Sequence, residues 1–564
     1  MAEDTPVRRG RRLRDRLPVR LRHHWRPAAS LGVGLAAMVV FLGDARISPY
    51  VTSSSRAEGD PITDDVRGSV DLYDTSVPHS IQLTYRQTEF DKMMKEFKKD
   101  GTKDYIEADL VVDGVYLNDV GIRLKGNSTL SSLRGGRGLP GGGRELPGAP
   151  QGAAAGGAPT AGAPGAGAGA QRGQGRPAGG GPGGMGGMVQ YDLSPSRPEE
   201  LPWLVKIDEY VEGRAYQGER EISLRPGSNG QVPLNEALSL TLTGKSGQKA
   251  ERYGFTELKV NNRPAATRLM VEAPDTDYAA DVGDGNGVLY KAKAGGSFEY
   301  RGEDPTEYET SFAQLDKKGS QDLEPVMRLI KWVNGASDEE FARDLGRYVD
   351  VDSLAAYLAT QNLLLNFDDM AGPGKNYLLW YDLDTRKFSV LGWDYNLTFS
   401  GDAKAGPDDS VGMPGGGPGG AAGGTPGGTP GKAPEGMPDQ PPEGMPDQAP
   451  QGMPEKAPEG MPGEAAGGGG GADAPAGRGG FMQHVLKTRF LGSDAFDAVY
   501  KKAYQRLYRE FYGSGEADRQ LKSLAEQVRA TGAASKELDT ALTKLTKTVT
   551  DRTRALAGDK EVTG

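Results

Sequence analysis

Two long blocks rich in glycine, proline and alanine limit what this chain can fold into. The first runs from about residue 134 to 190 and the second from about 403 to 480. Such segments bury too little apolar surface to offset the entropy of ordering, so we expect both to be disordered. The second block repeats an octapeptide whose prolines indicate an extended spacer. Because a globular pattern continues on both sides of each block, both are predicted to be inserts in one folded domain.

The N-terminal region has the pattern of a membrane-sorting segment. Residues 1–27 form a leader with nine arginines against three acidic residues, although the whole chain has a net charge of −10. The following run, 28–43, is uncharged and is either a transmembrane anchor or a signal-peptide core, with the anchor favoured. The basic flank places the leader in the cytoplasm and the body outside. The sequence therefore predicts a cell-membrane protein with a single N-terminal span, an extracytoplasmic body and no nucleic-acid partner.

The residue types that are scarce exclude several kinds of chemistry. The chain has no cysteine and four histidines, and two of these, His23 and His24, lie in the leader. Disulfides, thiolate metal sites and histidine-rich metal centres are therefore excluded, and a Ser-His-Asp triad is disfavoured. If the protein is an enzyme, carboxylates and lysines must carry out its chemistry.

The order of the expected elements indicates an α+β fold. Alternating strands and a hairpin at Asp113-Gly114 dominate the first half, with one helix ending at Gly101. Helices dominate the second half, apart from two strands at 376–382 and 388–394. The expected segments are a linker (44–67), the first part of the domain (68–133), its continuation (191–402) and C-terminal helices (481–560), separated by the two inserts.

One group of polar residues can form a reactive site. Asp368 and Asp369 end an apolar helix, Asn376 begins the next strand, and Asp394 ends the strand after that. Two antiparallel strands return the chain to its starting end, so Asp368, Asn376 and Asp394 can meet at one edge. Carboxylate and amide oxygens suit Mg²⁺, and a further aspartate can orient a hydroxyl group. Taken singly, each of these residues is also typical of a loop cap or turn.

Four short motifs resemble the family of CotH (spore-coat protein H) kinases. They read VGIRLKGNSTL at 120–130, LYKA at 289–292, NFDDMAGPGKNYLLWY at 366–381 and GWDYN at 392–396. The resemblance covers roughly residues 70–510 without the inserts. It implies an atypical protein-kinase fold with two lobes, an N-lobe that is mostly β and a C-lobe that is mostly α. The chain departs from ordinary kinases because it has neither H-R-D nor a G-x-G-x-x-G at the hairpin.

The resemblance also implies a role for individual residues. Asp368 would be the catalytic aspartate, and Asn376 and Asp394 would bind Mg²⁺ or Mn²⁺. The turn that contains Lys125, Asn127 and Ser128 would cover the phosphates of ATP, although it could equally be an ordinary hairpin end.

A lysine that contacts the phosphates is expected to form an ion pair with a glutamate on the next helix. Lys206 is the first choice for this lysine, with Glu236 as its partner, and Lys291 is the rival. Glu272 falls where the lobes would join, and its backbone could meet adenine.

The leading hypothesis is an extracytoplasmic, membrane-anchored kinase that transfers phosphate from ATP to Ser or Thr of surface or secreted proteins. The alternative is a non-catalytic binding, adhesion or coat-assembly module on the same fold. A glycan hydrolase that uses paired carboxylates is a third and weaker alternative.

Overall fold

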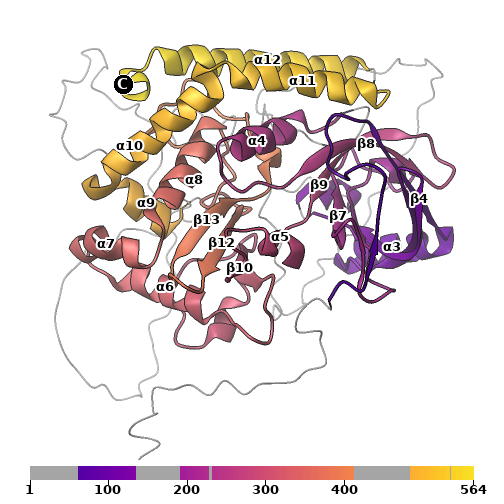
Figure 1. Cartoon of the computed structure of the whole chain (residues 1–564), viewed down its shortest axis with the longest axis horizontal. Coiled ribbons are helices and arrows are strands. Elements are labelled where there is room, and N and C mark those ends of the chain that lie inside the picture. Colours follow the sequence, from indigo (N-terminus) through magenta and orange to yellow (C-terminus); the bar gives the residue numbers. More distant parts are fainter. Residues whose placement is uncertain (1–60, 127, 135–190, 228–230, 412–482, 534) are drawn as a thin grey trace, which may run out of the picture. The chain divides into compact units, whose positions relative to one another are not determined.

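The computed structural model describes residues 61–126, 128–134, 191–227, 231–411, 483–533 and 535–564 (Figure 1). Both predicted low-complexity blocks lie mainly outside these ranges, as do the leader and the apolar run 28–43. The described chain mixes helices and sheets, which confirms the α+β class. The two-lobed kinase-like arrangement stays a prediction.

Seven strands of the first half close into a barrel, which was not predicted. Neighbouring strands pair antiparallel in the order β2-β3-β4-β5-β7-β9-β8, and a parallel pairing of β2 with β8 closes the ring. Asp113 and Gly114 both have positive φ, as the predicted tight hairpin between β3 and β4 requires. The strands are β2 (His79–Tyr85), β3 (Ile106–Val112), β4 (Val115–Leu124), β5 (Trp203–Lys206), β7 (Glu221–Leu224), β8 (Tyr253–Val260) and β9 (Ala266–Glu272).

The barrel encloses its own hydrophobic core. In β2 and β3 buried residues alternate with more exposed ones, so one face of these strands lines the interior, whereas β5, β7 and β9 are buried along most of their length. Helix α3 (Gln87–Asp100) adds Phe90, Met93, Met94 and Phe97 to this core and ends, as predicted, at Gly101 in a left-handed conformation. A short strand, β1 (Asp64–Val66), lies inside the predicted linker and pairs in parallel with β6 (Arg214–Tyr216).

A second sheet and the surrounding helices form a separate core. Its strands are antiparallel in the order β11-β10-β12-β13, and α4, which follows the barrel strand β7, belongs to this core. Helix α8 packs against β13 and α10, and α4 packs against α11 (Figure 1). The strands are β10 (Gly287–Ala292), β11 (Phe312–Gln314), β12 (Tyr377–Asp382) and β13 (Phe388–Gly392).

The helices around this sheet are α4 (Leu234–Lys245), α5 (Thr276–Ala280), α6 (Glu324–Gly335), α7 (Asp338–Asp344), α8 (Val351–Leu363), α9 (Val485–Leu491), α10 (Asp494–Tyr508), α11 (Glu516–Ala530), α12 (Lys536–Ala557) and α13 (Lys560–Thr563). Short 3-10 turns are η2 (Ser128–Arg134), η3 (Pro198–Glu200), η4 (Pro305–Tyr308), η5 (Leu345–Arg347) and η6 (Tyr395–Leu397), and η8 (Arg509–Gly513) is a π-helical turn.

The beginning of the second predicted insert is part of the fold. Residues 403–411 are described, and backbone carbonyls of Ala403, Ala405 and Gly406 accept hydrogen bonds from side chains of the helical region. These contacts could not be predicted from the residue types of the stretch, because its backbone carbonyls make them.

Candidate active site

Strands β12 and β13 bring three of the predicted site residues to one edge. Tyr377 at the start of β12 pairs with Gly392 at the end of β13. Asn376 directly precedes the first of these residues, and Asp394 follows the second by two. Helix α8 ends at Leu363, and the loop after it carries Asp368 back to Asn376. The expected return of the chain therefore places all three side chains at the same end of the sheet.

Asp368 is held by the loop that contains it. Its Oδ2 accepts a hydrogen bond from Asn376 Nδ2 at 3.0 Å, and its Oδ1 accepts one from the Gly374 amide at 2.6 Å. Burial, followed by the negative charges of Asp394 and Asp369, raises the pKa of Asp368 to about 6. A Cβ on Gly374 would lie 2.5 Å from Asp368 Oδ2, which explains glycine at this position. The carboxylate is therefore fixed, desolvated and able to bind a proton near neutral pH.

Asp394 has an unusual backbone and an unsatisfied oxygen. Its φ of 55° lies in the left-handed region, which costs free energy for a residue with a side chain. Its Oδ1 is buried and has no hydrogen-bond partner. A buried, unpaired carboxylate oxygen beside the Asp368–Asn376 pair fits an oxygen-liganded divalent cation. The set of two carboxylates and one amide is small, and the described residues contain no group of three or more His, Cys, Asp or Glu suited to a metal.

Three cations surround the indole ring of Trp393, the residue before Asp394. Lys291 Nζ lies 3.6 Å from the ring centroid, Lys125 Nζ 5.5 Å, and the Arg225 guanidinium carbon 5.8 Å. Lys125 directly follows β4, Arg225 directly follows β7, and Lys291 belongs to β10. Cations from the barrel and from the second sheet thus converge on one ring.

These cations are desolvated and repel one another. Burial, followed by the positive charges of Arg225 and Lys291, lowers the pKa of Lys125 to about 7. Burial also lowers the pKa of Lys291 to about 8, with Arg225 adding to the effect and Asp394 opposing it. The carboxylates of Glu236, Asp394 and Glu221 offset part of this repulsion, and a bound anion would offset more of it. A polyanion is therefore the ligand class that this arrangement suits.

The predicted ion pair between Lys206 and Glu236 is wrong. Glu236, which is 1% exposed, pairs with Arg225, whose Nη2 lies 2.5 Å from Glu236 Oε1. Lys206 Nζ instead contacts Glu209 Oε2 at 2.9 Å. Lys206 lies one strand away, opposite Glu221 in the β5–β7 register, whereas Arg225 directly follows the strand that leads to α4. Only lysines were expected in this role, whereas the residue that pairs with Glu236 is an arginine, which Pro226 and Gly227 follow.

The remaining predicted site residues have separate outcomes. Lys291, the rival lysine, and Lys125 join the cation cluster, but Asn127 lies outside the described residues. Ser128 begins η2, and its side chain is not described. Asp369 forms an ion pair with Lys487 of α9.

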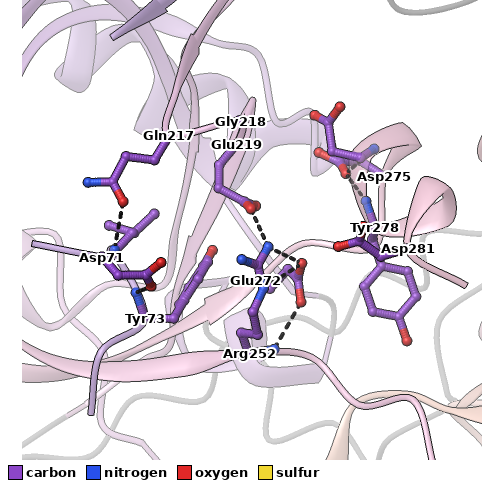
Figure 2. A network of polar contacts seen from close by, with 12 residues as sticks. Asp71, Tyr73, Gln217, Gly218, Glu219, Arg252, Glu272, Asp275, Tyr278 and Asp281 are labelled. Carbon is purple, nitrogen blue, oxygen red and sulfur yellow. Dashed lines mark hydrogen bonds and ion pairs between the residues drawn. The ribbon is translucent and has the colours of Figure 1, made fainter. Parts of the chain in front are cut away.

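Glu272 does not present its backbone amide to a ligand, since that group donates to Arg252 O at 2.9 Å. Its carboxylate accepts from Arg252 Nη2 at 2.6 Å, and Glu219 contacts the same guanidinium (Figure 2). In the same region Asp275 caps α5 by accepting from the Asp277 and Tyr278 amides. Glu272 is therefore part of a network that ties β8 and β9 to the β6–β7 turn.

Sequence reasoning missed Arg225 and the part played by Trp393. A signal existed for Trp393, because it stands beside Asp394 in one of the recognised motifs. No local signal marks Arg225, since its proximity to Glu236 depends on how α4 packs.

Comparisons with known proteins agree with the motif resemblance. A model of the CotH kinase protein family matches residues 195–548, more than half of the chain. The chain is also similar to the inner spore coat protein H of Bacillus subtilis (strain 168), with 25% identity over 198 residues. This match spans 34% of the chain and 54% of the relative, so it covers about half of the relative's length.

The predicted location requires correction. A cell-membrane protein with an extracytoplasmic body was expected, whereas the relative is a protein of the inner spore coat, which contradicts that location. The apolar run 28–43 lies outside the described residues. Among the helices that the structure does describe, none is long and apolar enough to cross a membrane. The run itself has 16 residues, fewer than the roughly 20 that a relaxed helical span needs.

Proposed function

Since the chain belongs to the CotH kinase protein family, we propose that it transfers the γ-phosphate of ATP to Ser or Thr hydroxyls of a protein, such as a spore-coat component. The observation that carries the proposal is the convergence of Lys125, Arg225 and Lys291 on Trp393, next to Asp394. Three desolvated cations on one ring, of which Arg225 is paired with Glu236, suit a triphosphate.

The chain's own residues divide the work of such a transfer. Lys125, Arg225 and Lys291 would bind and orient phosphate oxygens, and the Arg225–Glu236 ion pair would hold the guanidinium in place. Asp394 and Asn376 would hold Mg²⁺ or Mn²⁺, which would neutralise charge on the phosphates. The Oδ1 of Asp394 that lacks a partner is the oxygen available for this contact.

Asp368 would position the acceptor hydroxyl and accept its proton. With a pKa of about 6, raised mainly by burial, its carboxylate is mostly ionised at pH 7 and binds a proton more readily than an exposed aspartate. Hydrogen bonds from Gly374 and Asn376 fix its orientation, as positioning catalysis requires.

Phosphate transfer from labelled ATP tests the proposal. The full chain is incubated with ATP, Mg²⁺ or Mn²⁺ and a Ser/Thr-containing protein acceptor, as wild type and as Asp368→Asn and Asp394→Asn. We expect transfer by the wild type and a loss of about a hundredfold or more in each variant. Transfer that survives both substitutions would refute the assignment. Absence of transfer and of nucleotide-induced thermal stabilisation in the wild type would instead favour a non-catalytic coat-assembly module.

A matched set of variants tests which cation binds the nucleotide phosphates: Lys206, Lys291 or Arg225. Lys291→Met and Arg225→Met are expected to weaken nucleotide binding, because their side chains belong to the cluster around Trp393. Lys206→Met is the control, since its ammonium group contacts Glu209 instead. If Lys206→Met lost more nucleotide affinity than Lys291→Met and Arg225→Met, Lys206 would be the phosphate-binding lysine.

A further inference from the structure

Arg552 of α12 is a fully buried cation whose six hydrogen-bond acceptors are all uncharged. The residue is 0% exposed, although arginine is rarely buried without an acidic partner. Its guanidinium donates to four backbone carbonyls and two side-chain oxygens: Leu363 O (3.4 Å), Ala403 O (3.3 Å), Ala405 O, Asn362 O (3.1 Å), Asn362 Oδ1 (2.9 Å) and Tyr504 OH (3.1 Å). Every nitrogen of the fork is used.

Some of these hydrogen bonds satisfy the last carbonyl groups of α8. The last carbonyls of a helix have no partner within it and carry partial negative charge, so a cation stabilises them. Arg552 donates to the carbonyls of Asn362 and Leu363, and the hydroxyl of Tyr512 also donates to Leu363 O, at 2.8 Å. The amide of Phe399 donates to Leu364 O at 2.8 Å. Arg552 is therefore the cationic cap of the helix that leads to Asp368.

Other hydrogen bonds of Arg552 hold the chain that follows Asp394. Arg552 donates to the carbonyls of Ala403 and Ala405, and Asn362 Nδ2 donates to Gly406 O at 3.1 Å and Asp409 O at 3.0 Å. Asn362 Oδ1 in turn accepts from Arg552 Nη2. One guanidinium and one amide thus fasten residues 403–409 along the end of α8.

The two segments that Arg552 joins are the ones that carry the reactive carboxylates. Asp368 follows Leu363 by five residues, and Ala403 follows Asp394 by nine. Leu365 and Phe399, which lie between these points, have positive φ of 52° and 55°. Such backbone strain in residues with side chains persists only where the surroundings hold it in place.

We propose that Arg552 is a positioning residue for phosphate transfer, which sets the separation of Asp368 and Asp394 by clamping the end of α8 to residues 403–405. The proposal rests on the proposed function. Lysine cannot replace the fork, because one ammonium group cannot span carbonyls of both segments in the same geometry. Lys125, Arg225 and Lys291, which would bind the nucleotide, lie at β4, β7 and β10 and not on the two clamped segments. We therefore expect loss of the clamp to act mainly on the transfer step.

The test compares Arg552→Met and Arg552→Lys with Arg554→Met in the full chain. Arg554 lies on the same helix, and its side chain is 73% exposed and paired with Asp551. Two quantities are measured: hydrogen exchange of residues 366–376 and 399–409, and steady-state transfer normalised to the molecules that bind nucleotide. We expect faster exchange in both segments, a fall in kcat of about ten- to a hundredfold and a KM for ATP within about twofold of wild type for Arg552→Met. For Arg552→Lys we expect exchange rates and kcat between those of the wild type and Arg552→Met. Arg554→Met should match the wild type in both.

Tyr504→Phe keeps the proposal testable if Arg552→Met does not fold. This change removes one acceptor of Arg552 and the donor to Asn362 Oδ1, and the ring stays in place. It should raise exchange in 399–409 and lower kcat by a few-fold, with KM unchanged.

Unchanged kcat and exchange in the Arg552 variants, or equal loss of ATP affinity and kcat, would overturn the positioning role. If the wild type transfers no phosphate, the proposed function fails, and exchange alone then decides whether Arg552 joins the two segments.

Discussion

Substitution of Arg225 by methionine tests whether the buried pair with Glu236 is the anchor of the cation cluster. The side chains are 9% and 1% exposed, so the change leaves a carboxyl group in a dry site. Removing one partner of such a pair typically costs about 3–5 kcal/mol of unfolding free energy. Because the residues that surround Glu236 bury it almost completely, we expect a loss in this range at pH 8.

The loss should depend on pH in a defined direction. Burial raises the pKa of Glu236 from its usual 4.5 to about 7, although Arg225 acts to lower it. The folded protein therefore binds this proton more tightly than the unfolded chain does. The stability that this tighter proton binding by Glu236 contributes is fully present below about pH 4.5, and it is lost as pH rises through about 7. Without Arg225 the carboxyl group takes up a proton even more readily, so Arg225→Met should be less destabilised at pH 6 than at pH 8.

A second substitution supplies the decisive comparison. Arg225→Met/Glu236→Leu removes both charges and should recover most of the loss, since replacing a whole buried pair by apolar side chains is often neutral. Urea unfolding at both pH values measures the free energies. Lys206→Met is the control: the Lys206–Glu209 pair is partly exposed, at 27% and 26%, and its loss should cost less than about 1 kcal/mol. A double variant no more stable than Arg225→Met would refute the reasoning.

Three further predictions concern the site itself. Trp393→Leu removes the ring that Lys291 contacts at 3.6 Å and should weaken nucleotide binding by about 2 kcal/mol in calorimetry, with Trp393→Phe in between; equal affinities would contradict this. Transfer should rise with pH through about 6 as Asp368 ionises and fall between about 7 and 8 as Lys125 and then Lys291 lose their protons; a flat pH–rate profile would exclude these groups. Gly374→Ala should lower kcat at least tenfold, because its Cβ would lie 2.5 Å from Asp368 Oδ2. Gly335→Ala is the control, since a Cβ there meets open space, and similar kcat values in the two variants would show that the close approach at Gly374 is unimportant.

Much of the secondary structure was determined by local pattern. The Asp113-Gly114 turn specified its hairpin because both residues accept positive φ, and Gly101 ended α3 for the same reason. The order helix, aspartate, asparagine, strand, turn, strand, aspartate was enough to bring Asp368, Asn376 and Asp394 together. Antiparallel pairing of neighbouring strands needs no information from distant residues, so the sequence alone could place these three.

Tertiary structure decided whatever depends on contacts between distant segments. The barrel closes through a parallel pairing of β2 with β8, strands separated by more than 160 residues, for which no local pattern exists. Arg225 rather than Lys206 reaches Glu236 because α4 packs at the end of β7. Arg552 joins two carbonyl clusters about 150 and 190 residues away. A backbone carbonyl is the same in every residue, so the sequence carries no mark of which ones a buried guanidinium will bind.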